Sequence, residues 1–120
     1  MHRKIKFGGI IDPEGLSYIE IEAIAKRYEE LGFDSVMIFD HFYPVHSADN
    51  APYFECWTTL AALARVTNKI KVGSLVTCTS YRHPALLAKI STAVDRISNG
   101  RLIFGVGMGW YKKEYEMLDK

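Results

Sequence analysis

The sequence is poor in cysteine, in net charge and in long apolar runs, and each shortage excludes a class of protein. Two cysteines among 120 residues, Cys56 and Cys78, are too few for the disulfide framework of a small secreted domain. The formal net charge of +1 gives no electrostatic footprint for nucleic acid or an anionic membrane. No apolar run approaches the ~18 residues of a membrane-spanning helix. We therefore expect a cytoplasmic protein with reduced thiols.

What is present is the composition of an ordinary globular domain. Hydrophobic residues make up 48% of the chain and charged residues 24%, which is enough apolar material for a core. The chain contains no low-complexity segment and no linker-like stretch. A single domain over residues 1–120 is expected.

Four apolar runs alternate with helical segments along the chain. The runs start near residues 4, 33, 70 and 101, and spacings of about 30 residues are typical of one βα step. Val36–Phe39 is continuously apolar, as in a parallel strand that is covered on both faces. The alternation predicts an α/β fold with parallel strands and right-handed crossovers. The expected strands are Lys4–Ile11, Phe33–Phe39, Ile70–Val76 and Leu102–Phe104.

Helix signals lie between these runs. Ser17 precedes Glu20 by three residues, which is the spacing of a capping box, and helical periodicity then continues to Gly32. Pro84 is suited to the first position of another helix. Further helices are expected over Phe54–Val66, from Pro84 to Asn99-Gly100, and from Tyr111 to Leu118.

Ligands of parallel α/β folds bind beyond the carboxyl ends of the strands. In this sequence those ends carry Gly8-Gly9, Asp40-His41, Val76-Thr77 and Gly107-Met108-Gly109. A histidine titrates near neutral pH and a neighbouring carboxylate can orient it, so Asp40-His41 is either an acid/base pair or a structural hydrogen-bonding pair. His46 and Asp49 in the next loop fit no tight ligand spacing, and no metal site is predicted.

The glycines of the last run have an unusual spacing. Gly105, Gly107 and Gly109 form G-x-G-x-G, whereas a nicotinamide dinucleotide site uses G-x-G-x-x-G. Backbone without side chains at a strand end favours close approach of a flat ring. Trp110, the next residue, belongs either to the core or to the wall of that pocket.

Three motifs together resemble the luciferase-like monooxygenase superfamily, and more closely its branch that uses the deazaflavin coenzyme F420. The motifs are IFDHF at 38–42, GSLVTCTSYRHPALLAK at 73–89 and SNGRLIFGVGMGWYKKEY at 98–115. The family fold is a TIM (β/α)8 barrel of about 250 residues or more. The resemblance therefore implies that this chain is the N-terminal half of such a barrel, a (β/α)4 domain.

The resemblance also implies a role for each matched position. Asp40 and His41 would flank the deazaflavin and the substrate, with His41 as the acid/base. A non-prolyl cis peptide would press against the back of the ring, expected at Ser74-Leu75, with Leu75-Val76 as the alternative. Thr77 would hydrogen-bond the polar edge of the ring. The remaining cofactor contacts would come from the backbone of Gly107, Met108 and Gly109.

The implied function is hydride transfer between coenzyme F420 and a small organic substrate. An FMN-dependent monooxygenase is the alternative, and a catalytically silent half-barrel that only assembles is a third possibility of a different class. Barrels commonly bind phosphate after strands seven and eight, which this chain lacks. We expect two copies to pair as a homo-oligomer, or a complementary half-barrel of a longer or split enzyme to complete the fold.

Overall fold

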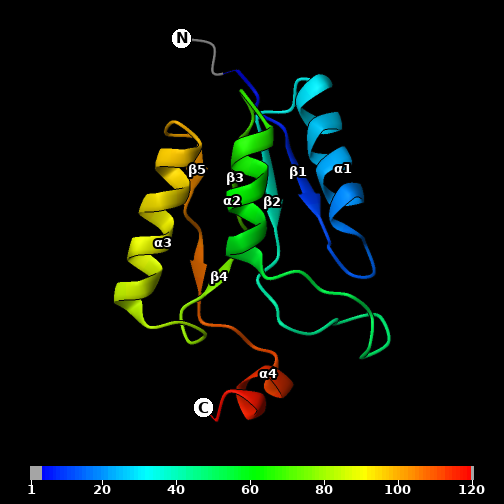
Figure 1. The fold of residues 1–120 in the computed structure, drawn as a ribbon, viewed down its shortest axis with the longest axis vertical. Coiled ribbons are helices and arrows are strands. Elements are labelled where there is room, and N and C mark those ends of the chain that lie inside the picture. The colour runs from blue at the N-terminus through cyan, green and yellow to red at the C-terminus, as the bar shows by residue number, and fades with distance from the viewer. Residues whose placement is uncertain (1–3, 120) are drawn as a thin grey trace.

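The computed structural model describes residues 4–119 and contains a parallel sheet with the strand order β1-β2-β3-β5 (Figure 1). All three neighbouring pairs are parallel. A shorter parallel pair, β4 and β6, continues the two later strands toward their carboxyl ends. The strands are β1 Gly8–Ile11, β2 Ser35–Ile38, β3 Lys71–Ser74, β4 Thr77–Cys78, β5 Leu102–Ile103 and β6 Val106–Gly107. The predicted alternating parallel α/β fold is confirmed.

Three long helices pack against one side of this sheet, and a short helix follows the last strand at its carboxyl edge (Figure 1). Within residues 4–119, none of the helices is long and apolar enough to cross a membrane. The helices are α1 Tyr18–Glu30, α2 Cys56–Val66, α3 Pro84–Ile97 and α4 Lys112–Met117. Every helix, and each of the strands β1, β2, β3 and β5, falls inside the run or segment in which it was expected, whereas β4 and β6 lie beyond the expected strands.

Local sequence signals explain where the helices begin and end. The capping box of α1 is present, because Ser17 Oγ accepts from the Glu20 amide at 3.3 Å and the Glu20 carboxylate accepts from the Ser17 amide at 2.8 Å. Gly32 follows α1 with φ +80°, which favours glycine. His83 caps α3 by accepting from the Ala85 amide at 3.2 Å.

The core lies between the sheet and the helices. The strands contribute alternate side chains to it, and α2 contributes Trp57, which is 2% exposed. This core includes Ile11, Ile21, Val36, Ile38, Trp57, Leu60, Leu63 and Val72.

The other side of the sheet has a row of residues that no helix covers (Figure 1). Ile10, Met37, Gly73 and Ile103 are paired across the four strands. Ile10 is 47% exposed. A Cβ at Gly73 would meet the main-chain oxygen of Ile103, so glycine lets β3 and β5 approach. In a closed barrel this row would face the interior.

The third expected strand, Ile70–Val76, is interrupted in the structure. A cis peptide bond joins Leu75 to Val76, so the prediction of Ser74-Leu75 is wrong and the alternative is confirmed. The backbone hydrogen bonds explain why the cis bond follows Leu75 and does not precede it, because the Leu75 amide still donates to the Ile38 carbonyl at 2.8 Å. Pairing resumes when the Thr77 amide donates to the Gly105 carbonyl at 2.9 Å. The chain therefore leaves the ladder one residue later than expected.

Candidate active site

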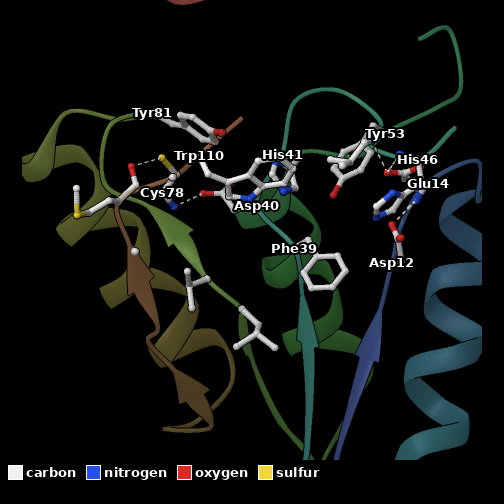
Figure 2. Close-up of a pocket in the computed structure, with 16 residues that line it drawn as sticks. Asp12, Glu14, Phe39, Asp40, His41, His46, Tyr53, Cys78, Tyr81 and Trp110 are labelled. Atoms are coloured by element: carbon white, nitrogen blue, oxygen red, sulfur yellow. Dashed lines mark hydrogen bonds between the residues drawn. The ribbon is translucent and has the colours of Figure 1, made fainter. Parts of the chain in front are cut away.

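A cavity of about 320 Å³ lies where the strands end, and residues after β1, β2, β3 and β5 line it (Figure 2). Three of the four strand ends identified in the sequence therefore converge, as parallel topology requires. The expectation for Gly8-Gly9 is wrong, because these glycines begin β1, and Asp12 and Glu14 line the cavity after its carboxyl end. The lining comprises Asp12, Glu14, Phe39, Asp40, His41, Val45, His46, Tyr53, Leu75, Val76, Cys78, Tyr81, Gly107, Met108, Gly109 and Trp110.

His41 is held by a carboxylate from the far end of the chain. Its Nδ1 lies 2.9 Å from Oε2 of Glu114, and the two side chains are 15% and 0% exposed. The rings of Tyr53, Trp110 and Tyr111 meet the imidazole edge-on, with centroids 6.3, 5.9 and 6.0 Å away. With Nδ1 engaged, Nε2 is the ring nitrogen left for a ligand. This is the geometry of an oriented acid/base.

Glu114 is a site residue that the sequence analysis missed. Its buried carboxylate accepts hydrogen bonds from His41, from the Tyr81 hydroxyl, and from the amides of Phe42 and Tyr43. Burial alone would raise the pKa of Glu114, but the bonds from His41, Tyr81 and Phe42 lower it below the ordinary glutamate value. The carboxylate is therefore ionised and can stabilise a protonated imidazole.

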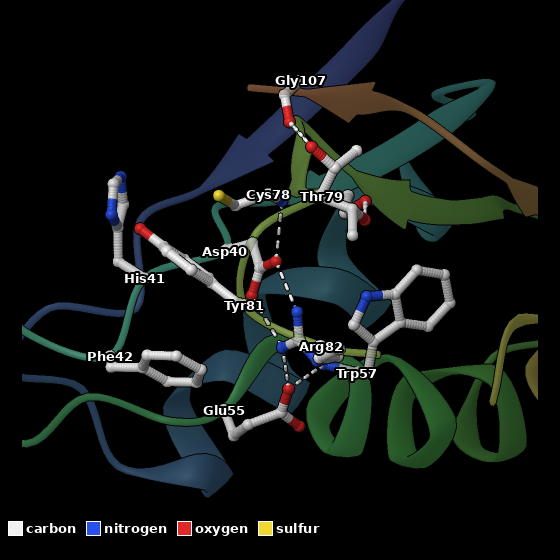
Figure 3. Close-up of polar contacts among 12 residues, drawn as sticks. Asp40, His41, Phe42, Glu55, Trp57, Cys78, Thr79, Tyr81, Arg82 and Gly107 are labelled. Atoms are coloured by element: carbon white, nitrogen blue, oxygen red, sulfur yellow. Dashed lines mark hydrogen bonds and ion pairs between the residues drawn. The ribbon is translucent and has the colours of Figure 1, made fainter. Parts of the chain in front are cut away.

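Asp40 has a different partner from the one expected. Its carboxylate forms a bidentate pair with Arg82, with Nη1–Oδ2 at 2.7 Å and Nη2–Oδ1 at 2.8 Å (Figure 3). Oδ2 also accepts from the Cys78 amide at 3.0 Å. The interpretation of Asp40 as the carboxylate that orients His41 is corrected, because both oxygens are committed to other groups and Glu114 takes that place.

Arg82 joins Asp40 to a second carboxylate, that of Glu55 (Figure 3). Burial lowers the pKa of Arg82, but the bonds to Asp40 and Glu55 outweigh burial and raise it. Glu55 also caps α2 by accepting from the amides of Trp57 and Thr58. This ion cluster, in which Asp40 and Arg82 are buried and Glu55 is partly exposed, fixes the strand end after β2 against the start of α2 and against β4.

Leu75 and Val76 form one wall of the cavity, and they are 42% and 40% exposed. Ser74 and Thr77, which flank them, are fully buried, and their hydroxyls hydrogen-bond each other. Neither belongs to the cavity lining. The structure therefore brings two residues of the predicted Ser74–Thr77 stretch to the site and places the other two behind them.

The carboxyl end of β6 and the residues after it form the neighbouring wall. Gly107, Met108 and Gly109 all line the cavity, and Met108 is 84% exposed. A Cβ at Gly107 would lie 2.5 Å from Cγ2 of Val76, so glycine is required where the two walls approach. Trp110 is 68% exposed and lines the cavity, which makes it a wall residue and not a core residue.

The loop after β2 is tied to the end of β1. The Glu14 carboxylate accepts from the amides of Val45, His46 and Ser47. Asp49 pairs with Lys113 at 2.6 Å. In the described part of the chain, no group of three or more histidine, cysteine or acidic side chains is placed to hold a metal ion.

This fold and site define a class of protein. It is a partial parallel (β/α)8 barrel with a ligand cavity at the carboxyl ends of its strands. The model of the luciferase-like monooxygenase family matches residues 4–119, and the chain belongs to that family.

Among curated relatives, the F420-dependent glucose-6-phosphate dehydrogenase of Amycolatopsis mediterranei is 35% identical over 107 residues, which is 88% of this chain and 32% of the relative. The enzyme of the same name from Gordonia bronchialis is 32% identical over 117 residues, which is 96% of this chain and 34% of the relative. The chain thus spans about a third of the length of these relatives.

Solved structures give the same family. An F420-dependent secondary alcohol dehydrogenase in complex with an F420-acetone adduct has a TM-score of 0.87 at 28% identity, covering 98% of this chain and 36% of that chain. The oxygenating constituent of 3,6-diketocamphane monooxygenase from Pseudomonas putida, in complex with FMN, has a TM-score of 0.80 at 27% identity, covering 95% and 32%. The similarity therefore includes proteins that use either cofactor.

Proposed function

We propose that this chain is a half-barrel of an F420-dependent oxidoreductase that transfers a hydride between the cofactor and a small organic substrate. The observation that carries the proposal is the His41–Glu114 pair at the edge of a cavity whose wall is Leu75-Val76. The F420-dependent enzymes among its relatives and structural neighbours support it.

The cavity fits a flat ring. Leu75 and Val76 offer an apolar wall for the back of the ring, and Gly107, Met108 and Gly109 offer main chain along another side. Ser74 and Thr77 would act from behind these walls, since their hydroxyls bond each other. Asp40 lines the cavity, but its carboxylate is bound by Arg82. When bound, the deazaflavin supplies the two-electron chemistry of hydride transfer.

His41 handles the proton in this proposal. As a substrate alcohol is oxidised to a carbonyl, its hydroxyl proton passes to Nε2 of His41. The ionised Glu114 on Nδ1 stabilises the imidazolium that results. In the reverse direction the same nitrogen returns the proton.

We expect the chain to bind F420 in preference to FMN. Titration of the purified chain with each cofactor, followed by absorbance and fluorescence, measures both dissociation constants. Tighter binding of FMN would replace the proposal by a flavin-dependent monooxygenase, which the FMN-bound neighbour favours. Binding of neither by a folded chain would leave a half-barrel that only assembles.

We further propose that residues 1–120 form one half-barrel domain that a second copy or a complementary half completes. Two exposed surfaces support this pairing. One is the uncovered row of Ile10, Met37 and Ile103, and the other is the unpaired edges of β1 and β5. Such surfaces pair or aggregate when they are exposed. A cytoplasmic location is part of the proposal, and the free thiols of Cys56 and Cys78 support it.

In light scattering after size exclusion, the chain is expected to elute as a dimer. Ile10→Lys, on the open side of β1, should give monomers because it places a charge in the pairing surface. Ile19→Lys is the matched control, since Ile19 is 80% exposed on α1, and it should remain dimeric. A stable, well-folded wild-type monomer would refute pairing of two copies.

A further inference from the structure

One oxygen of the Glu114 carboxylate is shared by two side chains. Oε2 lies 2.9 Å from Nδ1 of His41, and it also accepts a hydrogen bond from the Tyr81 hydroxyl. Oε1 instead accepts from the backbone amides of Phe42 and Tyr43. Within residues 4–119, Tyr81 is therefore the one side chain that competes with His41 for the charge of Glu114. The proposed mechanism makes no use of this competition.

Tyr81 is held so that its hydroxyl reaches this oxygen. Its ring packs against those of Phe42 and Tyr115, with centroids 4.9 and 6.2 Å away, and the residue is 8% exposed. Figure 3 shows the hydroxyl directed toward His41. Burial and the hydrogen bond to Glu114 raise the pKa of Tyr81, so the hydroxyl remains a donor throughout the pH range in which histidine titrates. The bond to Oε2 is therefore available in both protonation states of His41.

No other carboxylate contacts the His41 imidazole in the part of the chain that the structure describes. The neighbouring Asp40 is paired with Arg82 at 2.7 Å, which offsets its charge. The other charged or basic side chains that line the cavity are those of Asp12, Glu14 and His46. Uncharged rings meet the imidazole edge-on, those of Tyr53, Trp110 and Tyr111. The hydrogen bonds on Oε2 of Glu114 therefore have the most direct effect on a proton held by His41.

Two donors on one carboxylate oxygen divide its negative charge. A carboxylate beside an imidazole favours the protonated ring, and a second hydrogen bond to the same oxygen reduces that effect. A general acid/base works best when its pKa lies near the operating pH, because the group must both take up and release a proton. An unshared Glu114 would stabilise the imidazolium more strongly and make release of the proton harder.

We propose that Tyr81 is a positioning residue that acts on His41 through Glu114. By donating to Oε2, its hydroxyl limits how strongly the carboxylate stabilises the imidazolium, and so keeps His41 able both to accept a proton and to return it. The inference rests on the proposed function, in which His41 handles the proton. It assigns part of the control of that step to the loop between β4 and α3, which carries Tyr81.

The first test follows the His41 imidazole in the chain without cofactor. NMR of the protein with isotope-labelled histidine, recorded from about pH 5 to 9, gives the protonation midpoint of the imidazole, and His41→Ala identifies its signal. Tyr81→Phe should raise this midpoint by about one pH unit, the size expected for losing one hydrogen bond to a charged group. Tyr115→Phe is the matched control, because the Tyr115 hydroxyl donates to the Met108 carbonyl and not to Glu114, and it should keep the wild-type midpoint.

A merely structural role gives a different result. If Tyr81 only supported the fold, Tyr81→Phe would lower the urea midpoint and leave the titration of His41 where it was. An unchanged or lower His41 midpoint in the folded variant would therefore overturn the inference. Glu114→Gln should shift the His41 midpoint in the opposite direction, because an uncharged amide stabilises the imidazolium less, and a wild-type midpoint in that variant would also overturn it.

A measurement on the wild-type chain remains decisive if a variant does not fold. The Cζ carbon of a tyrosine responds to the hydrogen bond of its hydroxyl, so the NMR signal of Tyr81 Cζ should shift with the same midpoint as His41. The Cζ signal of Tyr115 should not follow that midpoint. A Tyr81 signal that does not move while His41 titrates would overturn the inference. The cofactor titration is independent of these measurements, so a chain that fails to bind F420 would refute the proposed function alone.

Discussion

Replacing His41 with alanine is expected to lower kcat about 10²–10⁴-fold, which is the range for loss of a general acid/base. The imidazole is oriented by Glu114 at 2.9 Å and faces the cavity, so its removal leaves the substrate hydroxyl without a proton acceptor. The dissociation constant of F420 should change little, because the proposed ring contacts are made by Leu75, Val76 and the glycine strand end. Steady-state kinetics and the cofactor titration measure the two quantities.

His46→Ala is the matched control for that experiment. His46 lines the same cavity, but its backbone amide, and not its side chain, is bound by Glu14. Its removal should leave kcat within a few-fold of wild type. Parallel losses of kcat and F420 affinity in His41→Ala would make His41 a binding residue and not the acid/base.

Replacing Glu114 with alanine should lower the free energy of unfolding by about 3–5 kcal/mol, as expected when one partner of a buried charged network is removed. The carboxylate is 0% exposed and accepts from His41, Tyr81 and two backbone amides, all of which would lose their acceptor. Urea unfolding at pH 7 measures the loss. Glu116→Ala is the control, since Glu116 lies on the same helix with its side chain 63% exposed, and its change should be under about 1 kcal/mol.

The same carboxylate predicts an acid-dependent loss of stability. Because folding lowers the pKa of Glu114 from 4.5, its contribution is fully present above that value. It is lost as the pH falls below 4.5 and through the lower pKa of the folded state. Glu114→Gln cannot titrate, so its stability should fall less steeply than that of wild type below pH 4.5. Identical slopes would show that other groups cause the acid sensitivity.

The elements of the fold were predictable because their signals are local. A capping box needs only Ser17 and Glu20, and the apolar run that starts at Val36 marks β2 without any contact to a distant residue. The location of the site was predictable because it depends only on the strand topology. Parallel strands bring Asp40-His41 and the glycine strand end to the same edge of the sheet, whatever their side chains contact. This explains why the cavity was placed correctly while its hydrogen bonds were not.

The errors involve contacts between distant parts of the chain. Glu114 is 73 residues from His41, and Arg82 is 42 residues from Asp40, so no spacing rule connects them. The carboxylate next to His41 in the sequence was the natural partner to assign to it. In the structure, however, the Asp40 carboxylate binds Arg82 and the Cys78 amide. The cis peptide bond lies one residue later than predicted, because the Leu75 amide still pairs with β2.

The position of α4 also constrains how two copies of this half-barrel could be joined in one polypeptide chain. β1 starts at one end of the sheet, while α4 lies beyond the opposite, carboxyl edge (Figure 1). A gene fusion of two copies would therefore have to carry the polypeptide back along the full height of the strands before the second β1 begins. A short glycine-serine connector would hold the second copy out of register, whereas an amphipathic helix laid over β5 would span that distance and cover an exposed edge. Tandem duplication of this unit thus depends on the design of its joining helix.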